Sequence, residues 1–158
     1  MNIQRFSALL FCLAIIFFSV WYVFFEDKKV TSEPFSQTPV FNKEIILGEQ
    51  SIYVAISDTA LTRAQGLSNT APLKENQGML FVFNEPDHYS FWMKEMKYPI
   101  DIIWFGENKK IVYMKENVDP NTYPRGFTPD DVALYVLEVP AGFIEAHKIS
   151  LGMSFYFK

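Results

Sequence analysis

Residues 100–116 read IDIIWFGENKKIVYMKE, two apolar runs separated by a short polar segment. Both runs are rich in β-branched and aromatic residues, which favour strands. Gly106 and the polar residues that follow it favour a turn between them. The stretch therefore predicts a hairpin whose first strand enters a core. Asp101 is the one charged residue in that first strand.

Short strands and turns also follow one another through the rest of residues 41–158. We expect a hairpin over 45–56 and further strands at 78–83, 89–94, 133–139 and 154–158. Residues 57–66 predict a short helix with Gly66 as its stop, and Pro140 suits the first position of a second one. Three prolines predict a long loop over 117–131. The chain is expected to be mostly β, a compact sandwich or barrel-like domain with two short helices.

The N-terminal region has a different composition. Residues 6–25 contain no charged residue over 20 positions, enough for a helix of about 30 Å, the thickness of the hydrocarbon core of a bilayer. A cleavable signal peptide is the alternative, but its apolar core is usually about 7–15 residues long and precedes small residues. Here the run ends in Phe24 and Phe25. The sequence therefore predicts a membrane anchor in residues 1–25, a tether in 26–40 and a β domain in 41–158.

We predict the orientation of this anchor from the lengths of the segments before and after it, because the flanking charges do not decide it. Arg5 precedes the span and Lys28 and Lys29 follow it, so the positive-inside count does not favour an outside domain. A short N-terminal tail before a large C-terminal domain is nevertheless the usual arrangement of a signal anchor. We expect a single-pass membrane protein whose C-terminal domain is extracytoplasmic.

Composition excludes several classes of function for the β domain. Cys12 is the only cysteine and lies in the predicted span, which excludes disulfides, thiolate metal clusters and a cysteine nucleophile elsewhere. The net charge of −4 supplies no basic field for nucleic acid. His88 and His147 lack metal-ligand spacing, and no phosphate-binding glycine loop or hydrolase motif is present. We therefore predict no metal and no cofactor.

Four charged residues lie among apolar neighbours and form the candidate site: Arg63, Lys94, Asp101 and Glu138. If residues 95–99 connect two antiparallel strands, Lys94 and Asp101 emerge at the same end of that pair. Two interpretations fit. The charges satisfy one another as a structural network, or they form the polar floor of an apolar ligand pocket. Tyr123 and Phe127, in the long loop, either cover such a pocket or attach the loop to the sheet.

Several motifs in chain order resemble the DUF192 family of uncharacterised bacterial and archaeal proteins: TRAQGL (62–67), GMLFVF (78–83), FWMK (91–94), YPIDI (98–102) and YVLEVPAG (135–142). The resemblance covers about residues 44–157 and implies a compact β fold but no established reaction. The four candidate residues, with Gly66, Gly78, Pro99 and Gly142, match the family pattern. Glu95 departs from it, because that position is commonly Asn.

Three hypotheses remain for function. The first is a membrane-tethered domain that binds a small molecule or an extended envelope ligand through the charged cluster. The second is an enzyme that uses Asp101 or Glu138 as acid or base, with Lys94 or Arg63 holding an anionic group. It predicts a carboxylate with a raised pKa in an open cleft. The third is a scaffold that contacts another envelope protein through exposed aromatic residues.

Overall fold

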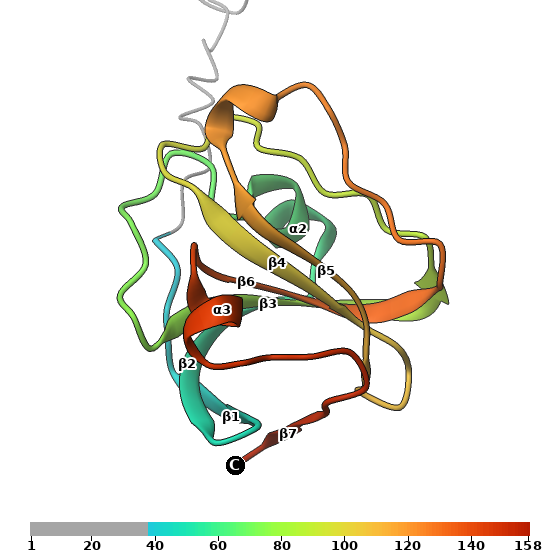
Figure 1. The fold of residues 1–158 in the computed structure, drawn as a ribbon. Coiled ribbons are helices and arrows are strands. Elements are labelled where there is room, and N and C mark those ends of the chain that lie inside the picture. The colour runs from blue at the N-terminus through green and yellow to red at the C-terminus, as the bar shows by residue number, and fades with distance from the viewer. Residues whose placement is uncertain (1–37) are drawn as a thin grey trace, which may run out of the picture. The chain divides into compact units, whose positions relative to one another are not determined.

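The computed structural model describes residues 38–158, which form one curled sheet of seven strands with two short α-helices (Figure 1). Across the sheet the strands run in the order β5-β4-β6-β3-β2-β1-β7. Neighbouring strands are antiparallel except β2 and β3, which are parallel. In chain order the elements are β1 (Lys43–Leu47), β2 (Gln50–Ser57), α2 (Ala60–Gln65), β3 (Gln77–Asp87), β4 (Ile100–Phe105), β5 (Ile111–Val118), the 3-10 turn η1 (Pro120–Thr122), β6 (Ala133–Pro140), α3 (Phe143–Ala146) and β7 (Phe155–Phe157).

The hairpin predicted from residues 100–116 is confirmed. β4 pairs with β5, with Ile103 opposite Met114, and the amide of Gly106 donates to the carbonyl of Lys110 across the turn at 2.9 Å. On its other side β4 pairs with β6. All six residues of β4 are buried, as expected for a strand with neighbours on both edges and apolar layers on both faces.

Alternate residues of the strands supply two apolar cores, one on each face of the sheet. The inner core receives side chains from every strand, and α3 adds Phe143 and Ile144 to it. Its other members include Ile45, Leu47, Ile52, Val54, Leu80, Ile103, Phe105, Ile111, Leu137, Val139 and Phe155. Because one core takes side chains from all seven strands, the sheet wraps around it in the manner of an incomplete barrel.

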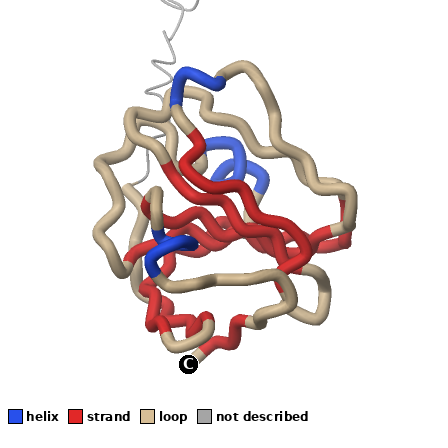
Figure 2. Tube along the Cα trace, viewed as in Figure 1, coloured by secondary structure: helices blue, strands red, loops and turns tan. Residues whose placement is uncertain are grey.

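Backbone hydrogen bonds bring the two ends of the sheet together at one corner. The amide of Ile111, at the start of β5, donates to the carbonyl of Met153 at 2.8 Å. The amide of Gly152 donates to the carbonyl of Ile111 at 3.0 Å. The tube in Figure 2 shows the C-terminal segment returning across this part of the molecule. These bonds satisfy backbone groups at the edge of β5 that an open sheet would leave unpaired.

The outer core lies on the opposite face of the central strands and is covered by loops. It includes Met79, Phe81, Ile102, Trp104 and Val136 from the sheet. Leu67 after α2, Met93, Tyr98 and Phe127 cover them. Figure 1 shows α2 and α3 on opposite sides of these strands. The segments 88–99 and 119–132 are joined by Phe91 and Phe127, whose backbones exchange hydrogen bonds of 2.9 and 2.8 Å.

The two helices differ in how their first turns are capped. Thr59 caps α2, because its hydroxyl accepts from the amide of Thr62, and the chain turns away at Gly66 with φ 52°. The start predicted for the second helix is wrong: Pro140 ends β6, and α3 begins only at Phe143. Gly142, at the N-cap, has no side chain to cap with.

Two further expectations are corrected. Of the two architectures expected, the sandwich is wrong, because it needs two sheets and the described residues form one curled sheet, which agrees with the barrel-like alternative. Residues 89–94 are not a strand and do not pair with β4, whose neighbours are β5 and β6. The single bridge between Phe91 and Phe127 is their only strand-like pairing in the described part of the chain.

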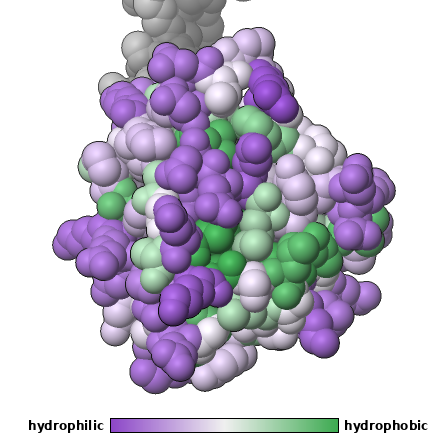
Figure 3. All heavy atoms as spheres, viewed as in Figure 1, coloured by the Kyte–Doolittle hydropathy of each residue, from purple (hydrophilic) through white to green (hydrophobic). Residues whose placement is uncertain are grey.

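The predicted anchor in residues 1–25 and most of the tether in 26–40 lie outside the described residues. Within residues 38–158, no helix is long and apolar enough to cross a membrane. Hydrophilic side chains cover much of the face in Figure 3, and hydrophobic groups gather in smaller areas between them. Most large apolar side chains are instead inside, in the inner and outer cores.

Candidate functional site

Glu138 is the buried polar residue around which the candidate site is built. It lies in the middle of β6, opposite Met79 on β3 and Ile102 on β4, and therefore points into the outer core. Its side chain is only 5% exposed, and its Oε2 atom has no hydrogen-bond partner among the described residues. Burial raises the pKa of this carboxyl group to about 8, because a low-dielectric environment disfavours the charged form.

A cavity of about 180 Å³ opens over Glu138. Aromatic side chains from β3 and the segment after it form much of its wall: Phe81, Phe83, Tyr89, Phe91 and Trp92. Phe81 and Phe91 meet edge to face at 4.7 Å, and the rings of Phe83 and Tyr89 stack. These contacts hold the wall in a defined shape. Polar and charged side chains complete the lining beside this aromatic wall: Arg63, Gln65, Ser68, Ser90, Lys94 and Glu138.

Arg63 contributes a cation to the lining from α2. Its Nη1 atom donates to the carbonyl of Asp58 at 2.6 Å and to the carbonyl of Val82 on β3 at 2.9 Å. Its guanidinium also lies over the ring of Phe83, 5.2 Å from the centroid. Arg63 therefore ties α2 to β3 and holds one wall of the cavity in place.

Lys94 supplies the second cation of the lining, from the segment that follows the aromatic wall. Its side chain is exposed, and its backbone carbonyl accepts from the hydroxyl of Ser68 at 2.8 Å. The neighbouring Glu95 does not line the cavity. Its Oε2 atom accepts from Nδ2 of Asn69 at 3.0 Å. Glu95 has φ 57°, a left-handed conformation that Asn adopts more readily than Glu. This backbone gives a physical reason for Asn at that position, independent of any ligand.

Asp101, the fourth predicted residue, lies away from the other three. It pairs with Val139 across β4 and β6, one position from Glu138, so its side chain enters the opposite face of the sheet. There it is fully buried and accepts from three backbone amides, those of Asn117 at 2.8 Å, Gly142 at 3.2 Å and Ile144 at 2.9 Å. The carboxylate of Asp101 thus caps the first turn of α3, because Gly142 at the N-cap has no side chain to do so.

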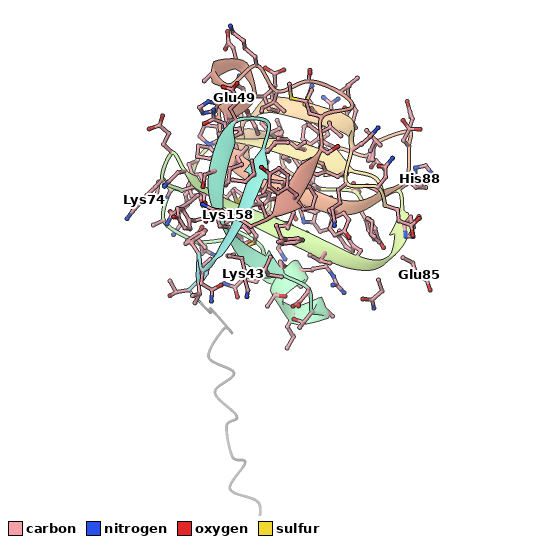
Figure 4. The ribbon with its side chains drawn as sticks, turned by 90° about the horizontal axis from the view of Figure 1, so that it is seen from below. Lys43, Glu49, Lys74, Glu85, His88 and Lys158 are labelled. Atoms are coloured by element: carbon pink, nitrogen blue, oxygen red, sulfur yellow. The ribbon has the colours of Figure 1, made fainter. Side chains whose placement is uncertain are left out.

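The structural charge network, one of the two interpretations of the four charged residues, is not formed among the described residues. Their one ion pair joins Lys158 to Glu44, at the C-terminal end of the chain, and Figure 4 labels Lys158 well away from Glu85 and His88. Arg63, Lys94 and Glu138 line one cavity without pairing, and Asp101 bonds to backbone amides. Asp101 and Glu138 also lie on opposite faces, so this pair cannot act on one bond as glycosidase carboxylates do.

Two aromatic residues of the long loop take different positions. Phe127 is buried in the outer core and attaches the loop to the sheet. Tyr123 is half exposed and meets the ring of Trp92 edge to face at 6.3 Å. Trp92 lines the cavity and is itself 58% exposed. The Trp92 and Tyr123 pair therefore lies where the cavity meets solvent.

The histidines have structural surroundings. His88 contacts the carbonyl of Pro129 through Nδ1 at 3.1 Å, and His147 is the C-cap of α3, with its ring packed on Phe143. No group of three or more potential metal ligands occurs among the residues that the structure describes.

Sequence reasoning missed the aromatic wall and the role of Gly78. A Cβ atom at Gly78 would meet the backbone oxygen of Glu138 at 2.9 Å and a methyl of Leu137 at 3.1 Å. The glycine therefore permits the close approach of β3 to β6 beside the cavity floor. An isolated glycine at the start of a strand pattern was the one signal that pointed to such an approach.

Comparison with known proteins agrees with this fold. A proposed transcription regulator from Sinorhizobium meliloti 1021 is 23% identical, with a TM-score of 0.70 over 77% of this chain and 97% of that one. A protein of unknown function from Novosphingobium aromaticivorans DSM 12444 is 25% identical, with a TM-score of 0.68 over 72% of this chain and 83% of that one. No curated protein matches this chain in sequence. The family model described as DUF192, Uncharacterized ACR, matches residues 43–157, and the chain belongs to the DUF192 family.

Proposed function

We propose that the domain binds a small ligand in the aromatic cavity, with Glu138 as its polar floor. The observation that carries the proposal is the unpartnered Oε2 atom of Glu138 in the lining. A buried polar group without a hydrogen bond costs about 1–3 kcal/mol, so such groups are few in folded proteins. A ligand that bonds to this oxygen removes that cost on binding.

The size of the cavity limits the ligand. Its volume of about 180 Å³ is close to the roughly 150 Å³ of a cavity that takes up benzene in another protein. The part of the ligand that enters is therefore about as large as one ring or a short branched chain. The rest of the molecule extends past Trp92 and Tyr123 toward solvent.

Thermal unfolding with a panel of small metabolites and glycans tests this function. A compound present at a hundred times its Kd stabilises the native state by about 2.7 kcal/mol and raises Tm by several degrees. We expect such a shift in the wild type and its loss in Glu138→Leu. Ser57→Ala is the matched control, because Ser57 is also buried and its hydroxyl also lacks a partner among the described residues, yet it does not line this cavity. A panel without any shift, or a shift that persists in Glu138→Leu, contradicts the proposal.

An acid–base enzyme is the second candidate, and the raised pKa of Glu138 favours it. With a pKa of about 8, this carboxyl group holds its proton at neutral pH, as a general acid must. Asp101 is sealed by backbone amides and does not share that role. Mass spectrometry of a bound compound after incubation separates the two functions. A binding protein returns the compound unchanged, whereas an enzyme converts it and Glu138→Gln stops the conversion.

We further propose that residues 6–25 anchor the domain in a membrane, with the domain on the extracytoplasmic side. The support is the absence of charged residues over 20 positions, a length that matches a bilayer. Cells that express the chain are expected to retain it in the membrane fraction after a carbonate wash. Protease added outside the cytoplasmic membrane should digest it. Release of the chain by the wash, or full protection from protease, contradicts this placement.

A further inference from the structure

The charged residues of the cavity lining differ in their availability to a ligand. The lining contains two cations, Arg63 and Lys94, and one acid, Glu138. Burial keeps the acid protonated at neutral pH by raising its pKa to about 8, and neither cation forms an ion pair with it. The lining therefore presents two uncompensated positive charges, a neutral carboxyl group and aromatic side chains.

Both cations retain donors that a ligand can use. The two carbonyls bound by Arg63 both accept from Nη1. Both bonds therefore use one guanidinium nitrogen, and neither carbonyl engages the fork formed by Nε and Nη2. The side chain of Lys94 is exposed and forms no ion pair with any residue that the structure describes. Carboxylates and phosphates match the donor fork of an arginine, because two of their oxygens can accept two parallel N–H bonds.

We propose that the ligand is a small organic anion with an apolar body. This inference rests on the proposed function and names the ligand class. The anionic group lies with Arg63 and Lys94, the body packs against the aromatic wall, and a hydroxyl or similar group at the inner end bonds to Glu138. A protonated carboxyl both donates and accepts, so it suits such a group.

Other titratable groups near Glu138 do not reverse this assignment. From the segment 88–99, Tyr98 interacts electrostatically with Glu138 and bonds to Thr70, while Tyr89 donates to the carbonyl of Glu85. The cross-strand neighbours of Glu138 on β3 and β4 are Met79 and Ile102, which carry no charge. Glu85 and Asp87 act on the hydroxyl of Tyr89 but do not line the cavity.

An amine is the ligand class of opposite charge, so comparing it with an acid tests the proposal directly. Aromatic walls with a carboxylate also suit an ammonium group, but that arrangement needs Glu138 ionised. Three probes share one ring size and differ in charge or hydroxyl: 4-hydroxyphenylacetate, phenylacetate and tyramine. Binding is followed by NMR of full-length protein with labelled methionine methyl groups. Met96 lines the cavity, whereas Met153 packs against the inner core and serves as the internal reference.

We expect 4-hydroxyphenylacetate to shift the Met96 methyl and leave Met153 unchanged. Phenylacetate should bind about tenfold more weakly, and tyramine more weakly still. Lys94→Met should weaken binding of the acid several-fold. Lys97→Met is the matched control, because Lys97 is also exposed, lies three positions further and does not line the cavity. Above pH 8, Kd in the wild type should rise about tenfold per pH unit as Glu138 ionises, and in Glu138→Gln it should not.

Tighter binding of tyramine than of the acid overturns the anion assignment and leaves the cavity as a ligand site. Equal effects of Lys94→Met and Lys97→Met also overturn it, as does the absence of any Met96 shift with all three probes. Failure of the proposed function is separate, because it is seen in the thermal panel, either as no stabilisation of the wild type by any compound or as a shift that persists in Glu138→Leu.

Discussion

Replacing Glu138 with Gln is expected to remove a large pH dependence of stability. The folded-state pKa of about 8 lies above the ordinary value of 4.5. Below pH 4.5 both the folded and unfolded states hold the proton. Between these two values the unfolded state releases it and the folded state keeps it, so the free energy of unfolding falls as pH rises. The full loss is about 3–5 kcal/mol by pH 8, and an uncharged Gln does not incur it.

Urea unfolding of wild type and Glu138→Gln at pH 4.5 and pH 8.5 measures this difference. The variant should gain about 3–5 kcal/mol relative to the wild type between the two conditions, because contributions of all other groups cancel. Glu116→Gln, an exposed change on β5, is the control and should follow the wild type at both values. Parallel stabilities of wild type and Glu138→Gln would show that the carboxyl group is not desolvated in the folded protein.

Removing the Asp101 carboxylate is expected to lower the free energy of unfolding at pH 7 more than any other substitution proposed here. Asp101→Ala leaves three backbone amides without their acceptor, and the buried one among them, that of Ile144, belongs to the first turn of α3. An unsatisfied buried donor costs about 1–3 kcal/mol, so we expect a loss of roughly 3–5 kcal/mol or more. Asp101→Asn should lose less, because one oxygen remains, but its NH₂ group then faces a backbone N–H. Urea unfolding at pH 7 gives both values.

Lys94→Met distinguishes this capping role from an ion pair. Lys94 is exposed and lies on the other side of the sheet from Asp101. The single change should alter stability by less than about 0.5 kcal/mol. Its effect should also add to that of Asp101→Asn, as expected for residues without shared partners. Partial recovery of stability in the double variant would instead indicate that the two side chains interact.

Much of the fold followed from local sequence patterns. The hairpin of β4 and β5 and the helix from Thr59 to Gly66 were recognisable because alternation and capping residues act within a few positions. Residues 89–94 were misassigned to a strand because aromatic residues raise strand propensity. In the structure those side chains cover the outer core and line the cavity, and their backbone makes only the bridge at Phe91.

The candidate site was only partly recognisable. Parity within each strand correctly marked Asp101 and Glu138 as charged residues among apolar ones. It could not show whether Asp101 and Glu138 lie on the same face of the sheet, because a shift of one residue in the strand pairing moves a side chain to the opposite face. The observed register, with Asp101 opposite Val139, sends the two carboxylates to different cores.

The sequence by itself determined the β class, most strand positions, the family and three of the residues that line the cavity. Hydrophobic periodicity and turn chemistry are local, so they are present in the chain before it folds. Only the tertiary structure decided which carboxylate is satisfied and which is not. Three amides from β5 and the α3 region surround Asp101, whereas α2, β3 and the segment 88–99 remove Glu138 from water without bonding its Oε2 atom. That difference arises from groups far apart in the chain, and no local pattern encodes it.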